Sequence, residues 1–286
     1  MAENPLKTET ARSLFNGAIF NGRVAAPFIG AAWLAMASIA AQADEADIGV
    51  SAQPCRGVPV QATEAHKASA DPYRAWMSDW LRLDWAQACR YAPANSQLPA
   101  ATGKRVVFLG DSITDGWIDL DPALFSGDRL DRGISGQTTG QMLLRVRPDV
   151  LELHPAVVHI LAGTNDIAGN TGPTSLAAIE GNIASIAELA HAHGVRVIIA
   201  SVLPAARYGW RPEVQPVETI KALNDWLRAY AKREHHVYVD YYAVLDDGHG
   251  AFKPSLADDG VHPNKEGYAA MHDLAEAAIA KALSRR

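Results

Sequence analysis

The sequence predicts an α/β protein, a three-layer α/β/α sandwich with a parallel sheet. The main observation is that short apolar, β-branched runs alternate with longer segments of helical periodicity from residue 105 onward. Strands separated by helices form parallel sheets, and right-handed crossovers place helices on both faces. The expected strands are 105–110, 156–163, 195–204 and 236–242, with a shorter one near 129–135; the expected helices are 138–152, 173–193, 217–233 and a last one after Pro263.

The N-terminal 43 residues have the features of an export signal. Three basic residues precede an uncharged run over residues 24–43, and two acidic residues follow it directly. The run ends in Ala41-Gln42-Ala43, a small-x-small sequence typical of a signal-peptidase site, so we expect cleavage after Ala43 and export to the periplasm or the medium. The alternative is an uncleaved membrane anchor, because a run of this length is able to span a bilayer. Contact with a membrane is expected only in that second case.

Residues 44–103 are expected to form a lead-in segment ahead of the α/β region. The segment begins with few large apolar residues, and a helix is predicted over residues 72–91. Asp71 is a suitable N-cap, and Pro72 fits the first helical position. Apolar residues at helical spacing form one stripe, which indicates packing against the main domain. These residues are Trp76, Trp80 and Leu83.

Composition and charge exclude several classes of function. The 286 residues are 48% hydrophobic and 20% charged, as in ordinary soluble globular proteins. A net charge of −6 without any basic run excludes nucleic acid as a partner. Two cysteines are too few for a cysteine-rich metal site, and no metal or cofactor is expected. In an oxidising compartment Cys55 and Cys89 would form a disulfide, and two free thiols are the alternative.

Four polar, glycine-containing segments follow strands or precede the last helix. The carboxyl ends of parallel strands share one edge of a sheet, where ligands bind in folds of this class. We therefore expect the four segments to lie close together. They are GDSIT (110–114), GISGQTT (133–139), AGTNDIAGN (162–170) and DDGVHPN (258–264).

Three residues in these segments have the chemistry of a nucleophilic triad. The hydroxyl of Ser112 is a weak nucleophile unless a base is within hydrogen-bond reach and an acid orients that base. Asp259 and His262 are three residues apart, so a single turn brings the carboxylate to the imidazole. Pro263 suits the first position of the last helix and fixes the backbone of His262. Asp258 is interpreted as a turn residue.

Acyl transfer also needs hydrogen-bond donors for the oxyanion of the tetrahedral intermediate. The expected donors are the backbone N–H groups of Ser112 and Gly136 and the side-chain amide of Asn165. One such donor contributes about 2.7–4 kcal/mol to transition-state stabilisation. Asp111 is expected to fix the nucleophile loop by accepting a backbone N–H bond.

The blocks GDSIT, GISG, GTND and DGVHP stand in the order found in the SGNH, or GDSL-type, hydrolases, which the sequence resembles over roughly residues 105–286. The longer stretches GDSITDGW and LAGTNDIAGN are similar to the bacterial branch related to platelet-activating-factor acetylhydrolase subunits. The resemblance implies a hydrolase domain over 104–286, a flavodoxin-like sheet of about five strands and ester hydrolysis through an acyl-serine without metal. The four name-giving residues map to Ser112, Gly136, Asn165 and His262.

A long loop, residues 204–216, follows the third of the four longer strands at the same edge of the sheet. It contains three prolines and two aromatic residues, and long loops at such an edge often shape the substrate pocket. One hypothesis is that Tyr208 and Trp210 line the substrate pocket. The alternative is that both rings pack against the domain.

These features together predict an exported serine esterase that cleaves carboxylic esters, with a preference for short acyl groups such as acetyl. One alternative is an acyltransferase that uses the same site. Another is a non-catalytic module that binds carbohydrate or lipid. The expected partner is a small-molecule, glycan or lipid ester; the sequence defines neither that ester nor the oligomeric state.

Overall fold

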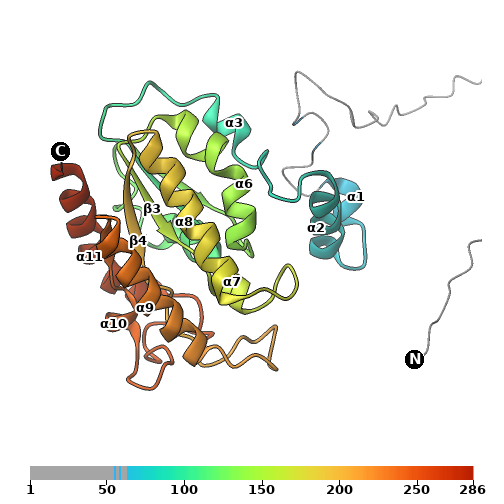
Figure 1. Cartoon of the computed structure of the whole chain (residues 1–286). Coiled ribbons are helices and arrows are strands. Elements are labelled where there is room, and N and C mark those ends of the chain that lie inside the picture. Colours follow the sequence, from blue (N-terminus) through green and yellow to red (C-terminus); the bar gives the residue numbers. More distant parts are fainter. Residues whose placement is uncertain (1–54, 56–57, 59–62, 286) are drawn as a thin grey trace, which may run out of the picture. The chain divides into compact units, whose positions relative to one another are not determined.

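The structure, a computed structural model, describes residues 55, 58 and 63–285, except for the side chains at 72–74, 76 and 77 (Figure 1). The export signal or anchor expected over residues 1–43 lies outside the described residues, as does the side chain of Trp76. Within the described part of the chain, no helix is both long enough and apolar enough to cross a membrane.

A five-stranded parallel sheet forms the centre of the fold, which confirms the predicted fold class. The strands lie in the order β2-β1-β3-β4-β5, and every neighbouring pair is parallel. The chain changes direction across the sheet between β1 and β3, and folds of this kind bind ligands outside the carboxyl ends of the strands at such a point. The strands are β1 (Val106–Gly110), β2 (Arg129–Gly133), β3 (Val157–Leu161), β4 (Arg196–Ala200) and β5 (Val237–Val239).

Helices cover both faces of the sheet because successive strand side chains point to opposite sides. Val107 and Leu109 of β1 belong to the core under α6, α8 and α9, whereas Val106 and Phe108 belong to the core under α11 (Figure 1). The helices are α1 (Glu64–Lys67), α2 (Pro72–Leu83), α3 (Ala92–Asn95), α4 (Ser112–Asp115), α5 (Trp117–Leu120), α6 (Thr139–Asp149), η1 (Leu151–Leu153), α7 (Thr164–Ile167), α8 (Leu176–Ala192), α9 (Val217–Arg233), α10 (Tyr242–Leu245) and α11 (Lys265–Ser284).

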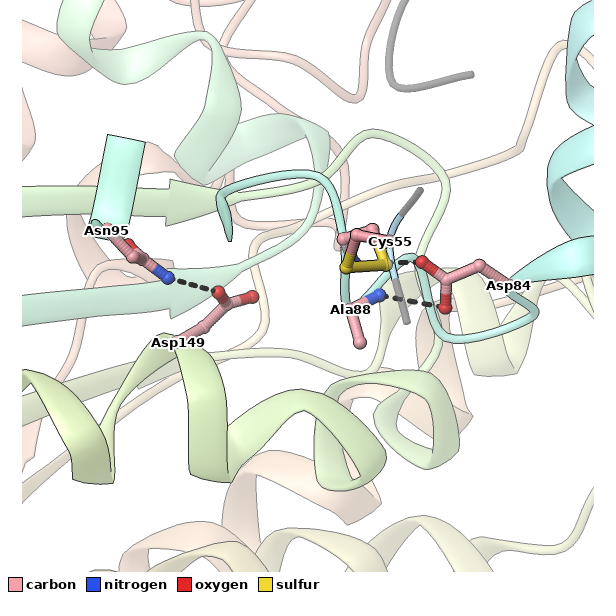
Figure 2. The surroundings of a disulfide bond; sticks show 6 residues. Cys55, Asp84, Ala88, Asn95 and Asp149 are labelled. Atoms are coloured by element: carbon pink, nitrogen blue, oxygen red, sulfur yellow. Dashed lines mark hydrogen bonds between the residues drawn. A yellow bond between two sulfur atoms is a disulfide. The ribbon is translucent and has the colours of Figure 1, made fainter. Parts of the chain in front are cut away.

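The helix predicted over residues 72–91 is shorter than expected, because α2 ends just before Asp84. The carboxylate of Asp84 accepts the backbone N–H groups of Ala88 at 3.0 Å and Cys89 at 2.8 Å (Figure 2). Gln87 has a left-handed backbone, with φ of 54°. Side-chain bonds of this kind compete with helical ones, so the chain turns here.

Cys55 and Cys89 form a disulfide, so of the two alternatives the paired state is the one observed (Figure 2). The bond spans 34 residues, and in the chain-entropy model a loop of this size adds about 3–4 kcal/mol of stability. The chain after Cys89 is attached to the α/β fold: the hydroxyl of Tyr91 donates to the carbonyl of Gly133, and the amide of Asn95 donates to Asp149 at 2.9 Å.

Candidate active site

The nucleophile loop crosses the ends of two strands because both strands end in glycine. Gly110 of β1 and Gly133 of β2 are partners in the sheet register. A Cβ on Gly110 would lie 2.0 Å from Oγ1 of Thr114, and one on Gly133 would lie 2.0 Å from the backbone nitrogen of Asp115. Only glycine at both positions allows α4 to pack this closely, and the packing places Ser112 at the carboxyl end of β1.

Asp111 caps α4 and does so from a fully buried position. Its Oδ1 accepts the backbone N–H of Ile113 at 3.0 Å, which confirms the expected role in fixing the loop. Burial raises the pKa of Asp111 to about 7, against smaller opposing effects of that hydrogen bond and of His262. A buried carboxyl is more stable in its neutral form.

Ser112, His262 and Asp259 form one hydrogen-bonded chain. Oγ of Ser112 lies 2.8 Å from Nε2 of His262, and Nδ1 of His262 lies 2.7 Å from Oδ2 of Asp259. The other carboxylate oxygen of Asp259 accepts the backbone N–H groups of Val261 at 2.9 Å and of His262 at 2.8 Å. These bonds overcome partial burial and hold the pKa of Asp259 below its ordinary value. The carboxylate is therefore ionised and fixed against the imidazole.

The positions of the residues around this hydrogen-bonded triad differ in part from the predictions. Asp258 accepts a bond from the side chain of Asn264 at 3.2 Å, which is consistent with a turn residue. Asn264, not the preceding residue, is the N-cap of α11, and its Oδ1 accepts the N–H of Gly267 at 3.0 Å. Pro263 was expected at the first helical position; it lies before the cap, where it forms a bridge with Ala257.

The predicted oxyanion donors lie on loops that contact the nucleophile loop. Gly136 has a φ of 80°, a conformation that favours glycine. Among the residues that the structure describes, none accepts a hydrogen bond from the N–H of Gly136 or of Ser112. Ser135 joins the two loops, because its hydroxyl donates to Asp115 at 2.7 Å. Both N–H groups are therefore available to a ligand.

Asn165 is buried at the start of α7, and its amide is held at both ends. Its Nδ2 donates to the carbonyl of Gln137 at 3.0 Å, and its Oδ1 accepts from Nδ2 of Asn170 at 2.7 Å. Nδ2 of Asn170 also lies 3.3 Å from the carbonyl oxygen of Gly136. The structure thus joins two of the predicted donors, Gly136 and Asn165, through a residue that the sequence analysis did not single out.

Arg145 is fully buried beneath the site and connects several of its segments. Its guanidinium donates to the carbonyl of Gly110 at 3.0 Å, to Gln137 at 2.5 Å and to Asp149 at 3.1 Å. Gly110 precedes the nucleophile loop, and Gln137 follows Gly136. This role of Arg145 is not evident from the sequence, because a charged residue on a predicted helix normally faces solvent.

The loop over 204–216 brings Trp210 to the site but not Tyr208. Trp210 is 43% exposed, and its ring centroid lies 6.4 Å from that of His262. Tyr208 is fully buried and hydrogen-bonds to Thr164 at 2.9 Å, so the prediction that it lines the substrate pocket is wrong. Its ring packs 5.1 Å from that of Trp210, and burial raises its pKa to about 12.

A hollow of about 550 Å³ lies beside His262 and Asp259. Most of its lining residues are charged or polar, and Leu120, which is 41% exposed, is one of two apolar residues among them. The other lining residues are Asp258, Pro263, Asn264, Lys265 and Glu266.

Comparisons with known proteins agree with this geometry. The family model described as GDSL-like Lipase/Acylhydrolase matches residues 108–270, a range that contains every residue of the candidate site. The Esterase TesA of Pseudomonas aeruginosa is 27% identical over 176 residues, which cover 57% of this chain and 81% of that protein. The uncharacterised lipoprotein YqeF of Bacillus subtilis is 32% identical over 117 residues, 35% of this chain and 48% of that protein.

The fold is also similar to that of a solved structure. The GDSL-like lipase of Bacteroides thetaiotaomicron has 46% sequence identity and a TM-score of 0.68. The match covers 70% of this chain and 100% of that one.

Proposed function

Because the chain belongs to the GDSL-like lipase/acylhydrolase family, also called the SGNH hydrolases, we propose that it is a serine esterase with Ser112 as its nucleophile. The observation that carries the proposal is the hydrogen-bonded chain of Ser112, His262 and Asp259, with distances of 2.8 and 2.7 Å. A serine within reach of an imidazole that a carboxylate orients is the arrangement that acyl transfer needs.

The first half of the reaction forms an acyl-serine. Oγ of Ser112 attacks the ester carbonyl while Nε2 of His262 takes the hydroxyl proton, and Asp259 stabilises the resulting imidazolium. The negative charge moves to the carbonyl oxygen, which accepts hydrogen bonds from the N–H groups of Ser112 and Gly136 and from the amide of Asn165. When the intermediate collapses, the carbon–oxygen bond to the alcohol breaks, and the imidazolium gives its proton to the leaving alcohol.

The second half returns the free enzyme. A water molecule attacks the acyl-serine while His262 takes one of its protons, and the same three donors stabilise the second oxyanion. Collapse releases the carboxylic acid, and Ser112 recovers its proton from the imidazolium. Each half is balanced in protons, so the chain's own residues suffice for the chemistry.

The lining of the hollow beside His262 supports a short acyl group and a polar alcohol. Its wall contains Asp258, Lys265 and Glu266, and charged side chains disfavour a long alkyl chain. Leu120 and Pro263 are the two apolar residues of the lining. We propose that the substrate is a short-chain ester, such as an acetyl ester, of a hydroxyl-rich compound.

Two findings support a location outside the cytoplasm. The Cys55–Cys89 disulfide is typical of proteins in oxidising compartments, and the lipoprotein from Bacillus subtilis is one of the relatives. We propose that residues 1–43 direct the protein to the periplasm or the medium, with cleavage after Ala43. The N-terminal sequence of protein recovered from the extracytoplasmic fraction tests this, and an N-terminus at Met1 would favour the anchor.

Hydrolysis of p-nitrophenyl acetate, butyrate and octanoate by the full chain tests the function. We expect kcat/KM to fall from acetate to octanoate, and we expect Ser112→Ala to abolish turnover of all three. Faster turnover of octanoate would contradict the short-chain preference. A folded protein without any ester turnover would contradict the esterase assignment, and acyl transfer to an added alcohol in place of acid release would favour the acyltransferase.

A further inference from the structure

The proposed oxyanion hole depends on which way the amide of Asn165 faces. A primary amide has a donor end and an acceptor end of nearly the same size. Only the NH2 end stabilises an oxyanion, whereas the carbonyl end would repel it. Something in the structure therefore has to select one of the two orientations.

The neighbouring side chains leave Asn165 only one orientation. The indole N–H of Trp210 is a donor only, and it lies 3.0 Å from Oδ1 of Asn170. This bond fixes Oδ1 of Asn170 as the acceptor, and it turns Nδ2 of Asn170 toward Oδ1 of Asn165 at 2.7 Å. The NH2 group of Asn165 then faces the carbonyl of Gln137 at 3.0 Å, which uses one of its two hydrogens. The second hydrogen is left for the substrate.

Asn170 also contacts the second proposed donor loop. Its Nδ2 lies 3.3 Å from the carbonyl oxygen of Gly136, so one side chain bridges Gly136 and Asn165. Asn165 is only 3% exposed, so losing a hydrogen-bond partner of its amide is costly. The exposed end of this hydrogen-bond chain is Trp210, whose ring lies 6.4 Å from that of His262.

We propose that Asn170 is a positioning residue that holds the amide of Asn165 with its NH2 group toward the oxyanion, and that the indole N–H of Trp210 fixes Asn170 in turn. The proposal rests on the serine esterase function argued above. It assigns a role to Trp210 besides its place next to His262: the indole N–H of Trp210 helps to set the geometry of the oxyanion hole.

A double-mutant cycle with p-nitrophenyl acetate tests the link between Asn170 and Asn165. We expect Asn165→Ala to lower kcat by about 10²–10³-fold, and Asn170→Ala to lower it by about tenfold, with KM little changed in both. In the Asn165→Ala background, Asn170→Ala has no further effect on kcat, because the amide that it orients is gone. Equal losses in the two backgrounds would overturn the proposal.

Asn170→Asp sharpens the cycle because it keeps the size of the side chain and the acceptor for Trp210. It replaces the donor by a carboxylate oxygen facing Oδ1 of Asn165, and this repulsion drives the Asn165 amide to turn. We expect a greater loss of kcat than in Asn170→Ala, at an unchanged midpoint of the pH–rate profile. A loss in Asn170→Asp no greater than in Asn170→Ala would contradict the orienting role.

Trp210→Phe tests the exposed end of the chain, and Trp85→Phe is its matched control. Trp85 is 42% exposed, close to the 43% of Trp210, and its ring lies near Gly140, where a Cβ would be 3.7 Å from it. We expect kcat to fall roughly threefold in Trp210→Phe, the effect of one lost hydrogen bond, and to stay unchanged in Trp85→Phe. Equal effects of the two substitutions would overturn the role of the indole N–H.

The same assay separates a failure of this inference from a failure of the proposed function. Wild-type protein that hydrolyses the ester, with Ser112→Ala inactive, supports the function whatever the cycle gives. Activity that persists in Ser112→Ala would overturn the function, and the inference with it. Thermal unfolding of each variant identifies any loss of kcat that is due to misfolding.

Discussion

The two ends of the sheet both carry histidines, but the partners of their imidazole rings differ. At the carboxyl end, His262 lies between Ser112 and Asp259. At the amino end there is a second hollow of about 610 Å³, and its wall is rich in imidazole and guanidinium groups. These belong to His191, His235, His236, Arg196, Arg233 and Arg285.

The difference lies in the partners of the imidazoles. In the part of the chain that the structure describes, no side chain hydrogen-bonds to the ring of His191, His235 or His236. Two of the helices end here, α8 at Ala192 and α9 at Arg233, and cationic side chains complement the carbonyl ends of helices. A histidine that acts as a catalytic base needs a fixed carboxylate at one ring nitrogen and a nucleophile at the other. The described side chains around His191, His235 and His236 provide neither.

The largest expected effect separates the two ends directly. His262→Ala removes the proposed base, and we expect kcat for p-nitrophenyl acetate to fall on the order of 10⁴–10⁶-fold. His236→Ala, the matched change at the other end, leaves kcat unchanged. Steady-state kinetics of both variants, with circular dichroism to check folding, makes the comparison. Comparable losses in the two variants would remove the distinction between the ends.

The buried charge at the carboxyl end gives the next largest effect. Arg145 and Asp149 are both completely buried, and Arg145→Met removes the ion-pair partner of the carboxylate, which among the described residues keeps only the hydrogen bond from Asn95. We expect the free energy of unfolding to fall by about 3–5 kcal/mol in urea titrations.

The control is Arg196→Met at the amino end, where a half-buried guanidinium donates to the carbonyls of Ala156, Leu283 and Arg285. For Arg196→Met we expect the free energy of unfolding to fall by about 1 kcal/mol. A loss of unfolding free energy in Arg196→Met as large as in Arg145→Met would contradict the view that a buried ion pair costs more to break than hydrogen bonds to backbone carbonyls.

The raised pKa of the buried Asp111 carboxyl predicts that the stability of the protein depends on pH. Its folded pKa of about 7 is above the ordinary value of 3.8, so between these pH values the folded state binds more protons than the unfolded state. Stability is therefore lost as pH rises from about 4 to 7. Asp111→Asn does not titrate, and we expect its stability relative to wild type to rise on the order of 3 kcal/mol from pH 4 to pH 8. A stability difference that is the same at pH 4 and pH 8 would refute this.

His236 has the opposite pH dependence and the smallest effect. Burial, helped by nearby His191, lowers its pKa to about 4, below the ordinary 6.5. Its contribution to stability is complete above pH 6.5 and is lost as pH falls toward 4. Because the ring is only half-buried, we expect this titration to change the free energy of unfolding by less than about 1 kcal/mol. Replacement by His236→Leu flattens the stability curve over this pH range if the account holds, and leaves its slope unchanged if it does not.

The sequence predicts the carboxyl end well because local spacing governs much of it. Asp259 and His262 are three residues apart, and the structure joins their side chains at 2.7 Å. The parallel sheet follows from alternation, and it brings the loop of Ser112 to the same edge. Glycines that end β1 and β2 explain why the serine loop passes so close to the sheet.

Long-range contacts explain what the sequence did not predict. Asn170 closes the polar segment that holds Asn165, but its role depends on Trp210, forty residues further along the chain. Tyr208 and Trp210 are two residues apart and look alike in the sequence, yet one is buried and the other is 43% exposed. The early end of α2 before Asp84 is a local effect instead, because the side chain of Asp84 satisfies backbone N–H groups four and five residues further on, which a longer helix would use.

Covalent labelling by a p-nitrophenyl alkylphosphonate, read by peptide mass spectrometry, tests whether Ser112 is the nucleophile and His262 its base. We predict that Oγ of Ser112 in the full chain displaces p-nitrophenolate from the reagent and forms the phosphonyl adduct on this residue alone, while His262 takes the hydroxyl proton. His236→Ala is expected to label at the same rate, and His262→Ala at least about a hundredfold more slowly. An adduct on another residue, or equal labelling of the His262→Ala variant, would contradict the assignment of Ser112 and His262.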